Sequence, residues 1–279
     1  MKRLTLQQKG FTLVELAIVM TIIGLLIGGI LKGQELMQNA RITATVSQVK
    51  SYSAAVTTFK DMYQATPGDM LNAGTRLVGC PPAATGAGCN PLPANAGDNV
   101  VGLPGWAAAG WGVPGATATT GPAIATNVDH ERYLFWAHLL LSNLIGGINA
   151  DGLNAVTNFS FGVTNPQAKI GGGFIVGYDT GTIGPESAGP FQTVATGISG
   201  MVGVITTDPK LALPTAANTG ALAPLRAAQL DRKMDDGRPA TGYVQAYGVS
   251  ASCFTSAAAQ VYNETISTND CGLIFRLEN

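Results

Sequence analysis

The hydrophobic positions near the start of the chain form one run from Phe11 to Leu31, and Glu15 is its only charged residue. As a helix, a run of this length would span about 30 Å, the thickness of the hydrocarbon core of a bilayer. The preceding residues, 1–10, carry basic side chains and no acidic one. No small-residue cleavage site follows the run, so it differs from an ordinary secretory signal. The pattern predicts a retained membrane-spanning helix whose basic leader stays on the cytoplasmic side.

After Lys32 the hydrophobic positions recur at spacings of three and four, which indicates one face of an amphipathic helix. The sequence Thr66-Pro67-Gly68-Asp69 ends this pattern, because proline and glycine terminate helices. We therefore expect one helix from about Thr12 to Gln64, apolar all round in its first half and on one side in its second half. The positions of this stripe are Ile42, Val46, Val49, Tyr52, Val56, Phe59 and Tyr63.

The rest of the chain predicts short elements separated by turns. A stretch rich in glycine, proline and alanine, from about Leu71 to Asn127, predicts a long loop. Asp129 to Ile145 predicts a buried helix capped by Gly146-Gly147, and Pro224 to Met234 predicts a short helix with proline at its start. Strand-like runs divided by turn residues predict an antiparallel sheet. These runs are Phe159–Val163, Phe174–Tyr178, Met201–Thr207, Tyr243–Gly248 and Leu273–Leu277.

Composition argues against an enzyme and against a nucleic-acid-binding protein. Charged residues make up 12% of the chain, below the usual fraction of about 25%, and the 36 glycines favour loop-rich extracellular structure. A net charge of −1 provides no field that would attract nucleic acid. The sequence contains no G-x-S-x-G, H-E-x-x-H or P-loop motif. We expect no enzymatic activity and no cofactor.

The four cysteines predict disulfide bonds. Cys80, Cys89, Cys253 and Cys271 form no C-x-x-C pair, and the chain has only two histidines, so a zinc site is not expected. An even number of cysteines in an exported chain favours disulfides, of which three pairings are possible. Loop-closure entropy favours the two local pairs, Cys80–Cys89 and Cys253–Cys271.

A few other residues admit both a functional and a structural interpretation. Trp106 and Trp111 could bind a partner, but we expect them to cover the edge of the core. His138 stands among apolar residues, with His130 too far away for a metal pair, so we expect a hydrogen-bonded core residue. The cluster Asp231, Asp235 and Asp236, followed by Gly237, could bind calcium. The alternative, which we expect, is the end of a helix followed by an Asp-Gly turn, with no metal.

Glu15 is unusual, because a carboxylate in an apolar membrane segment costs a few kcal/mol and commonly marks a functional site. One interpretation is a protonated side chain, or one that lies near the membrane surface. In the other, another chain supplies a partner charge. If the chain were cut after Gly10, Phe11 would carry a new α-amino group. A staggered neighbour could then present this group to Glu15 inside an apolar bundle.

The segment KGFTLVEL, from Lys9 to Leu16, resembles the prepilin leader that type IV pilins share with the pseudopilins of type II secretion. The resemblance implies that a prepilin peptidase cuts between Gly10 and Phe11, that Phe11 is N-methylated, and that Glu15 guides assembly. Many major pilins carry a proline at the position of Lys32, so a minor pilin and a pseudopilin both remain open.

The resemblance also implies an α+β, pilin-like fold, with the long helix packed on an antiparallel sheet in preference to a coiled coil. It divides the chain into a cleaved leader (1–10), a transmembrane and fibre-core segment (11–31), an amphipathic continuation (32–66) and a globular periplasmic or extracellular domain (67–279). The implied function is a structural subunit of a type IV pilus-like fibre. Alternatives are a type II secretion pseudopilin and a minor tip subunit with an adhesive role.

The expected partners are copies of the chain, other pilins, the prepilin peptidase and methyltransferase, and an inner-membrane assembly platform. We expect the subunit in the inner membrane before assembly, and in a periplasmic or cell-surface fibre afterwards.

Overall fold

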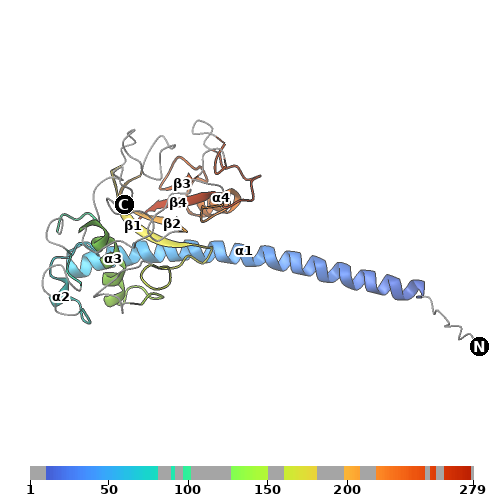
Figure 1. The fold of residues 1–279 in the computed structure, drawn as a ribbon, viewed down its shortest axis with the longest axis horizontal. Coiled ribbons are helices and arrows are strands. Elements are labelled where there is room, and N and C mark those ends of the chain that lie inside the picture. Colours follow the sequence, from blue (N-terminus) through green and yellow to red (C-terminus); the bar gives the residue numbers. More distant parts are fainter. Residues whose placement is uncertain are drawn as a thin grey trace, which may run out of the picture. The chain divides into compact units, whose positions relative to one another are not determined.

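The computed structural model describes residues 11–80, 89–91, 97–101, 127–149, 160–180, 198–207, 218–248, 252–255 and 261–277. The chain divides into two compact units, Met1–Arg41 and Ile42–Asn279. Helix α1 (Leu13–Tyr63) has residues in both units, and it confirms the single long helix predicted from about Thr12 to Gln64 (Figure 1). Trp106 and Trp111 lie outside the described residues.

Helix α1 ends at a left-handed residue. Gln64 has φ 50°, and its N–H donates to the carbonyl of Lys60 at 2.8 Å, which closes the last turn in the αL capping motif. Arg76 donates to the carbonyl of Tyr63, the last residue of the helix, and its guanidinium lies over the Tyr63 ring. The helix therefore ends three residues before Thr66, where the predicted stop sequence begins.

Four strands form one antiparallel sheet beside the second half of α1 (Figure 1). Their order in the sheet is β1-β2-β4-β3, so the last strand of the chain pairs with both β2 and β3. The antiparallel sheet predicted from the sequence is confirmed, and each strand overlaps a predicted run. The bounds are β1 Gly173–Thr180, β2 Ser199–Thr206, β3 Val244–Gly248 and β4 Cys271–Arg276.

The sheet is apolar on both faces, which explains why its strands appear in the sequence as continuous hydrophobic runs. One face joins the main core with the α1 stripe and α3 (Asn127–Leu141), and Tyr52 makes edge-to-face ring contacts with Trp136 at 5.2 Å and Phe174 at 5.1 Å. The other face forms a second buried cluster: Ile175, Ile198, Val202, Val204, Tyr247 and Ile274.

Two glycines of the sheet lie opposite aromatic rings. Gly203 pairs with Phe275 and Gly272 pairs with Tyr247 across neighbouring strands. A Cβ at Gly203 would lie 2.5 Å from the Phe275 ring, and a Cβ at Gly272 would lie 2.2 Å from the Tyr247 ring. Any side chain at these positions would displace the ring, so the strands need glycine there.

Helix α4 (Pro224–Met234) has the predicted bounds, with proline in its first turn. The end of α3 was predicted wrongly. Asn143, with φ 57°, takes the left-handed position of a Schellman motif, so α3 stops at Leu141 before Gly146 is reached. The N–H of Asn143 bonds to Leu140, and that of Leu144 bonds to Leu139.

Two further details differ from the predicted elements. A short helix, α2 (Ala73–Arg76), lies within the stretch that was predicted to be a loop. The predicted strand Phe159–Val163 was also wrong. Phe159 lies outside the described residues, and residues 160–163 form turns with a single isolated bridge from Phe161 to Asn165. Hydrogen bonds from Thr164 and Asn165 to Ser160 fold this segment back on itself.

Candidate assembly segment and polar sites

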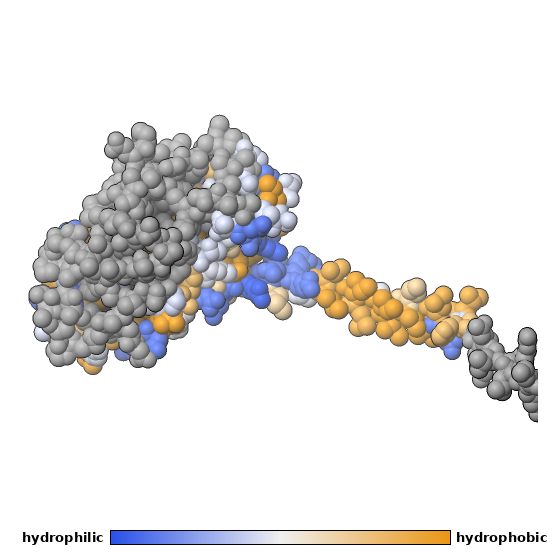
Figure 2. All heavy atoms as spheres, in the orientation of Figure 1, coloured by the Kyte–Doolittle hydropathy of each residue, from blue (hydrophilic) through white to orange (hydrophobic). Residues whose placement is uncertain are grey.

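The first half of α1 exposes nearly all of its apolar side chains. Among them, Phe11 is 92% exposed and Leu25 is 77% exposed. Figure 2 shows this part of the helix as an almost continuous hydrophobic surface. Within the described residues, α1 is the one helix whose length and composition would allow it to cross a membrane. Such a surface is stable only in lipid or against other apolar chains.

Glu15 forms a capping box with Thr12 at the start of α1. The backbone N–H and the hydroxyl of Thr12 donate to Oε2 of Glu15, at 2.8 and 2.9 Å, and the N–H of Glu15 donates to the Thr12 hydroxyl at 3.2 Å. The carboxylate is thus held over the first helical turn by Thr12. Within the part of the chain that the structure describes, Oε1 has no partner and is open to another donor.

The four cysteines form the two local pairs. Cys80 and Cys89 are joined with a Cα–Cα distance of 5.9 Å, and Cys253 and Cys271 are joined at 5.1 Å. Cys271 is the first residue of β4, so the second disulfide ties a segment outside the sheet to the strand that pairs with both β2 and β3.

His138 is a core residue, as predicted. It is fully buried, and its Nδ1 accepts from the N–H of Gly68 at 2.9 Å, while its Nε2 lies 2.8 Å from the carbonyl of Cys89. These partners require a neutral ring with its proton on Nε2. His138 therefore joins the turn after α1 to the first disulfide. The side chain of His130 lies outside the described residues.

Asp69 is a second polar residue that joins loops next to this turn. Its carboxylate accepts from the N–H groups of Gly97 and Asn99, the latter at 2.6 Å. Burial raises the pKa of Asp69, and these two hydrogen bonds oppose the rise by stabilising the ionised form. The sequence Thr66-Pro67-Gly68-Asp69 thus holds loops together in addition to following the helix.

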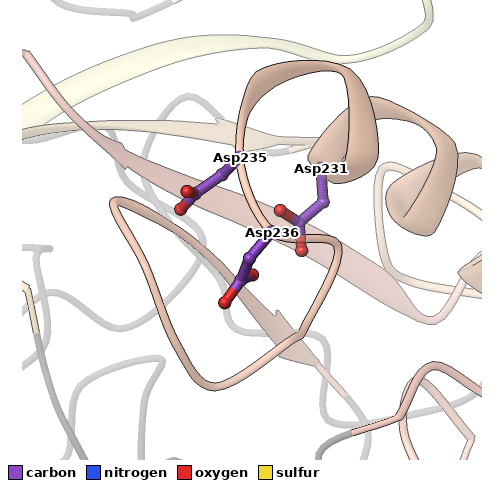
Figure 3. A group of neighbouring side chains, drawn as sticks. All are labelled: Asp231, Asp235 and Asp236. Carbon is purple, nitrogen blue, oxygen red and sulfur yellow. The ribbon is translucent and has the colours of Figure 1, made fainter.

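The carboxylates of Asp231, Asp235 and Asp236 lie within 4.8 Å of one another at the end of α4 (Figure 3). Donors of the chain itself occupy all three. Asp235 accepts from the N–H groups of Tyr243 and Val244, at the start of β3. Asp236 accepts from Arg238 N–H and from the Thr241 hydroxyl. The bonds to Asp235 fasten the turn after α4 to the start of β3, and the bonds to Asp236 close the turn itself, as expected for a helix end followed by a turn.

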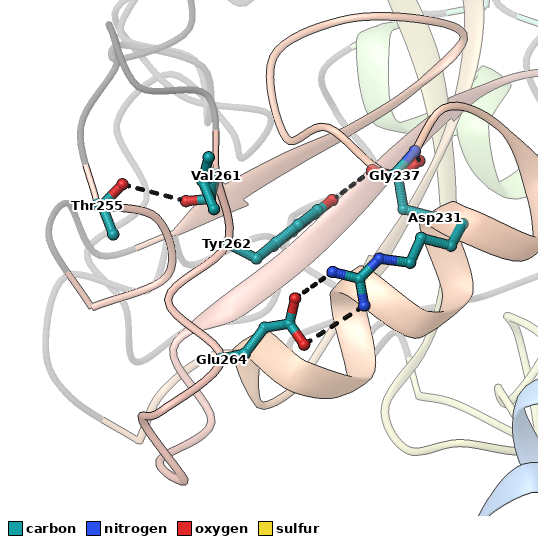
Figure 4. Close-up of polar contacts among 7 residues, drawn as sticks. Asp231, Gly237, Thr255, Val261, Tyr262 and Glu264 are labelled. Atoms are coloured by element: carbon teal, nitrogen blue, oxygen red, sulfur yellow. Dashed lines mark hydrogen bonds and ion pairs between the residues drawn. The ribbon is translucent and has the colours of Figure 1, made fainter.

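The third member, Asp231, is fully buried. It accepts from the Tyr262 hydroxyl at 2.8 Å and from the N–H of Gly237 at 3.2 Å (Figure 4). Burial raises the pKa of Asp231 to about 7. The bonds from Tyr262 and Gly237 lower it, and the charges of Asp236 and Asp235 raise it further.

The sequence interpretation missed the roles of Thr12, Asp69 and Tyr262. The Thr-x-x-Glu spacing from Thr12 to Glu15 is a capping-box pattern and could have been found. No local pattern marks Asp69 or Tyr262, because their partners lie about thirty residues away in the chain.

Comparisons with known proteins bear on the N-terminal segment alone. No curated protein and no solved structure matches the chain. A family model described as the prokaryotic N-terminal methylation motif matches residues 6–31, which include Gly10, Phe11 and Glu15. The motif thus coincides with the start of the exposed apolar helix, which precedes an antiparallel sheet in an α+β arrangement consistent with a pilin-like fold. The chain carries the signature of type IV pilins and pseudopilins.

Proposed function

We propose that this chain is a structural subunit of a type IV pilus-like fibre and not an enzyme. It enters the inner membrane as a prepilin with residues 1–10 in the cytoplasm. A prepilin peptidase then cuts between Gly10 and Phe11, and the new amine is methylated. With an inner-membrane assembly platform, the subunit leaves the membrane and polymerises through residues 11–31, which presents residues 67–279 in the periplasm or at the cell surface.

The observation that carries this proposal is the methylation motif on a helix whose large apolar side chains are exposed. Burying each of these side chains contributes about 1.5–3 kcal/mol. The helix therefore needs an apolar environment at every stage. Lipid supplies it before assembly, and the helices of neighbouring subunits supply it in a fibre.

Glu15 gives assembly its register in this proposal. The free Oε1 would accept the methylated amine of Phe11 from a neighbouring subunit, while Oε2 stays on its own Thr12. Pairing the two charges in an apolar bundle relieves the cost of leaving each unpaired. Copies of the chain and other pilins could both supply this amine.

Processing and assembly can be tested separately with point variants. Gly10→Glu should leave the precursor uncut, as the resemblance implies, and intact-mass measurement would show it.

Glu15→Ala should be inserted and cleaved normally but give few fibres. Glu15→Gln should be intermediate, because it keeps an acceptor without the charge. The measurement is the yield of sheared fibres relative to the total membrane-inserted subunit.

Two control variants separate the charge from the cap. Thr12→Ala removes the capping hydroxyl, at a cost of about 0.5–2 kcal/mol, but keeps the carboxylate, so it should assemble better than Glu15→Ala. Glu35→Ala removes an exposed carboxylate that pairs with Lys32 on the same helix, and it should assemble normally. A normal fibre yield from Glu15→Ala would show that this carboxylate has no role in assembly.

A minor pilin or a type II secretion pseudopilin is the second candidate. The observation that favours it is that α1 continues without interruption through Lys32, where many major pilins carry proline. Genes of a secretion system beside this one would favour the pseudopilin, and pilus genes would favour the pilin. Cells that lack the gene but keep intact fibres and lose adhesion would indicate a tip subunit.

A further inference from the structure

The second disulfide encloses a small hairpin that lies against α4. Phe254 forms a bridge with Tyr262, the N–H of Thr255 donates to Val261 at 3.0 Å, and the N–H of Asn263 donates to Cys253 at 3.0 Å. We call the described residues 252–255 and 261–264 the disulfide hairpin. The bond from Cys253 to Cys271 fixes one end of the hairpin to β4, so the hairpin would stay attached to the domain if it left α4.

Two polar side-chain contacts link the disulfide hairpin to α4 (Figure 4), in addition to the burial of Cys253, Phe254 and Tyr262 in the core that α4 shares. The hydroxyl of Tyr262 donates to Asp231, and both terminal nitrogens of the Arg232 guanidinium contact the carboxylate of Glu264. The Arg232–Glu264 pair is partly exposed, so solvent screens it and its contribution is small. The Asp231–Tyr262 contact is buried on both sides.

Asp231 faces several ionisable groups on the elements around it. Acidic neighbours are Asp235 and Asp236, from the turn after α4, while the charge of Asp231 also acts on Tyr243 of the same loop and Tyr262 of the hairpin. Arg232 is the basic neighbour on its own helix, and its guanidinium is directed to Glu264. When Asp231 is ionised, the site therefore contains three close carboxylates, and the Arg232 guanidinium is engaged with the carboxylate of Glu264.

We propose that a proton on Asp231 keeps the disulfide hairpin fastened to α4, and that loss of this proton in more alkaline surroundings releases the hairpin. An ionised Asp231 gains hydration when Tyr262 moves away from it, because both side chains are buried where they meet. The device is independent of fibre formation, and in a subunit outside the cytoplasm it would respond to the external pH.

The direction of the pH response follows from the pKa of Asp231 in the fastened and in the released state of the hairpin. With the hairpin fastened, burial holds the pKa of Asp231 at about 7, and with the hairpin released the pKa returns toward its ordinary acidic value. The fastened state therefore binds the proton more tightly. The proton therefore stabilises the fastened state fully at acidic pH, and this stabilisation is lost as the pH rises toward about 7.

Hydrogen exchange of the mature full-length protein in detergent micelles, with a chelator present, tests this. The amides of Thr255 and Asn263 bond across the hairpin, and an isolated two-stranded hairpin is only marginally stable, so both amides become exposed once the hairpin leaves α4. Exchange times are corrected for the intrinsic effect of pH. We expect their protection to fall by up to about tenfold per pH unit between pH 5 and 7, then to level off. Protection that stays constant from pH 5 to 8.5 would overturn the proposal.

Three variants assign the effect to Asp231. Asp231→Asn cannot lose a proton, so its protection should not change with pH. Asp61→Asn removes an exposed carboxylate on α1 and should behave like the wild type. Tyr262→Phe removes a bond that favours the ionised carboxylate, so its protection should level off at a higher pH. A pH response that persists in Asp231→Asn, does not shift in Tyr262→Phe, or needs added calcium would refute a proton-controlled latch.

Discussion

His138 joins two loops that are far apart in the sequence through the two nitrogens of one ring. The N–H of Gly68 and the carbonyl of Cys89 are both backbone groups, and the imidazole between them is fully buried. A buried backbone group that loses its partner costs about 1–3 kcal/mol, whereas the bond itself contributes less when water is the alternative. The value of His138 lies in leaving neither group unsatisfied.

We expect His138→Phe to lower the free energy of unfolding by about 2–5 kcal/mol, because two buried groups lose their partner together. Phenylalanine keeps a ring that can stack on Phe59, as the imidazole does, so the loss isolates the hydrogen bonds. His138→Gln can restore one bond and should lose less. Chemical denaturation in detergent measures both, and a change below about 0.5 kcal/mol in His138→Phe would contradict this role.

Gln64 provides a second test, because it holds the left-handed position that glycine prefers. Gln64→Gly and Gln64→Ala both lose the hydrogen bond from the side-chain amide of Gln64 to the Asp61 carbonyl, but only alanine keeps a Cβ in the strained backbone conformation. We expect Gln64→Gly to be the more stable of the two by about 1 kcal/mol. Thermal unfolding of the two variants side by side measures this difference, and equal stability would mean that Gln64 is unstrained.

At the scale of elements, the sequence predicted the helices and strands whose buried positions are periodic or whose ends carry strong local signals. The stripe from Ile42 to Tyr63 predicted the second half of α1, and the proline at position 224 predicted the start of α4. The end of α3 was wrong because Asn143 adopts the left-handed conformation, and an asparagine is a weaker signal than the Gly146-Gly147 pair that follows. Residues 160–163 failed as a strand because contacts with Thr164 and Asn165 outweigh their apolar character.

The functional residues also fall into two groups, those that a local sequence pattern marks and those that only the fold brings together. Gly10, Phe11 and Glu15 belong to a local motif and could be found by inspection. Asp231 was found as part of an acidic cluster, but its partner Tyr262 was not, because only the fold places the hairpin on α4. Loops that meet in space, such as those at Gly68 and Cys89, leave no pattern along the chain.

The two disulfides should differ in their contributions to stability. They close loops with sequence separations of 9 and 18, and the chain-entropy relation gives about 2.7 and 3.2 kcal/mol for them. Peptide mapping without reduction should recover Cys80 with Cys89 and Cys253 with Cys271 from native material. Replacing the second pair by serine should destabilise the protein slightly more than replacing the first. Recovery of all four residues as free thiols would contradict both expectations.

At the scale of the whole molecule, the two units differ in how their apolar side chains are covered. The unit Met1–Arg41 contains a helix that exposes apolar side chains and depends on its surroundings to cover them. The unit Ile42–Asn279 covers its own apolar side chains, since the α1 stripe, α3, α4 and one face of the sheet share a core. Under the proposed function, stability and assembly depend on different residues, which allows one to be altered without the other.

A protein that begins at Ile42 should show this separation. Every residue of the shared core lies at or beyond Ile42, so the shortened chain should fold, remain soluble without detergent and unfold cooperatively. It lacks the apolar helix and Glu15, so it should not enter fibres when it is produced beside the full-length subunit. The control is a chain that begins at Phe11, whose globular unit should unfold at the same denaturant concentration in detergent. Aggregation of the shortened chain, or a transition shifted by more than the experimental error, would show that the first unit contributes to the fold of the second.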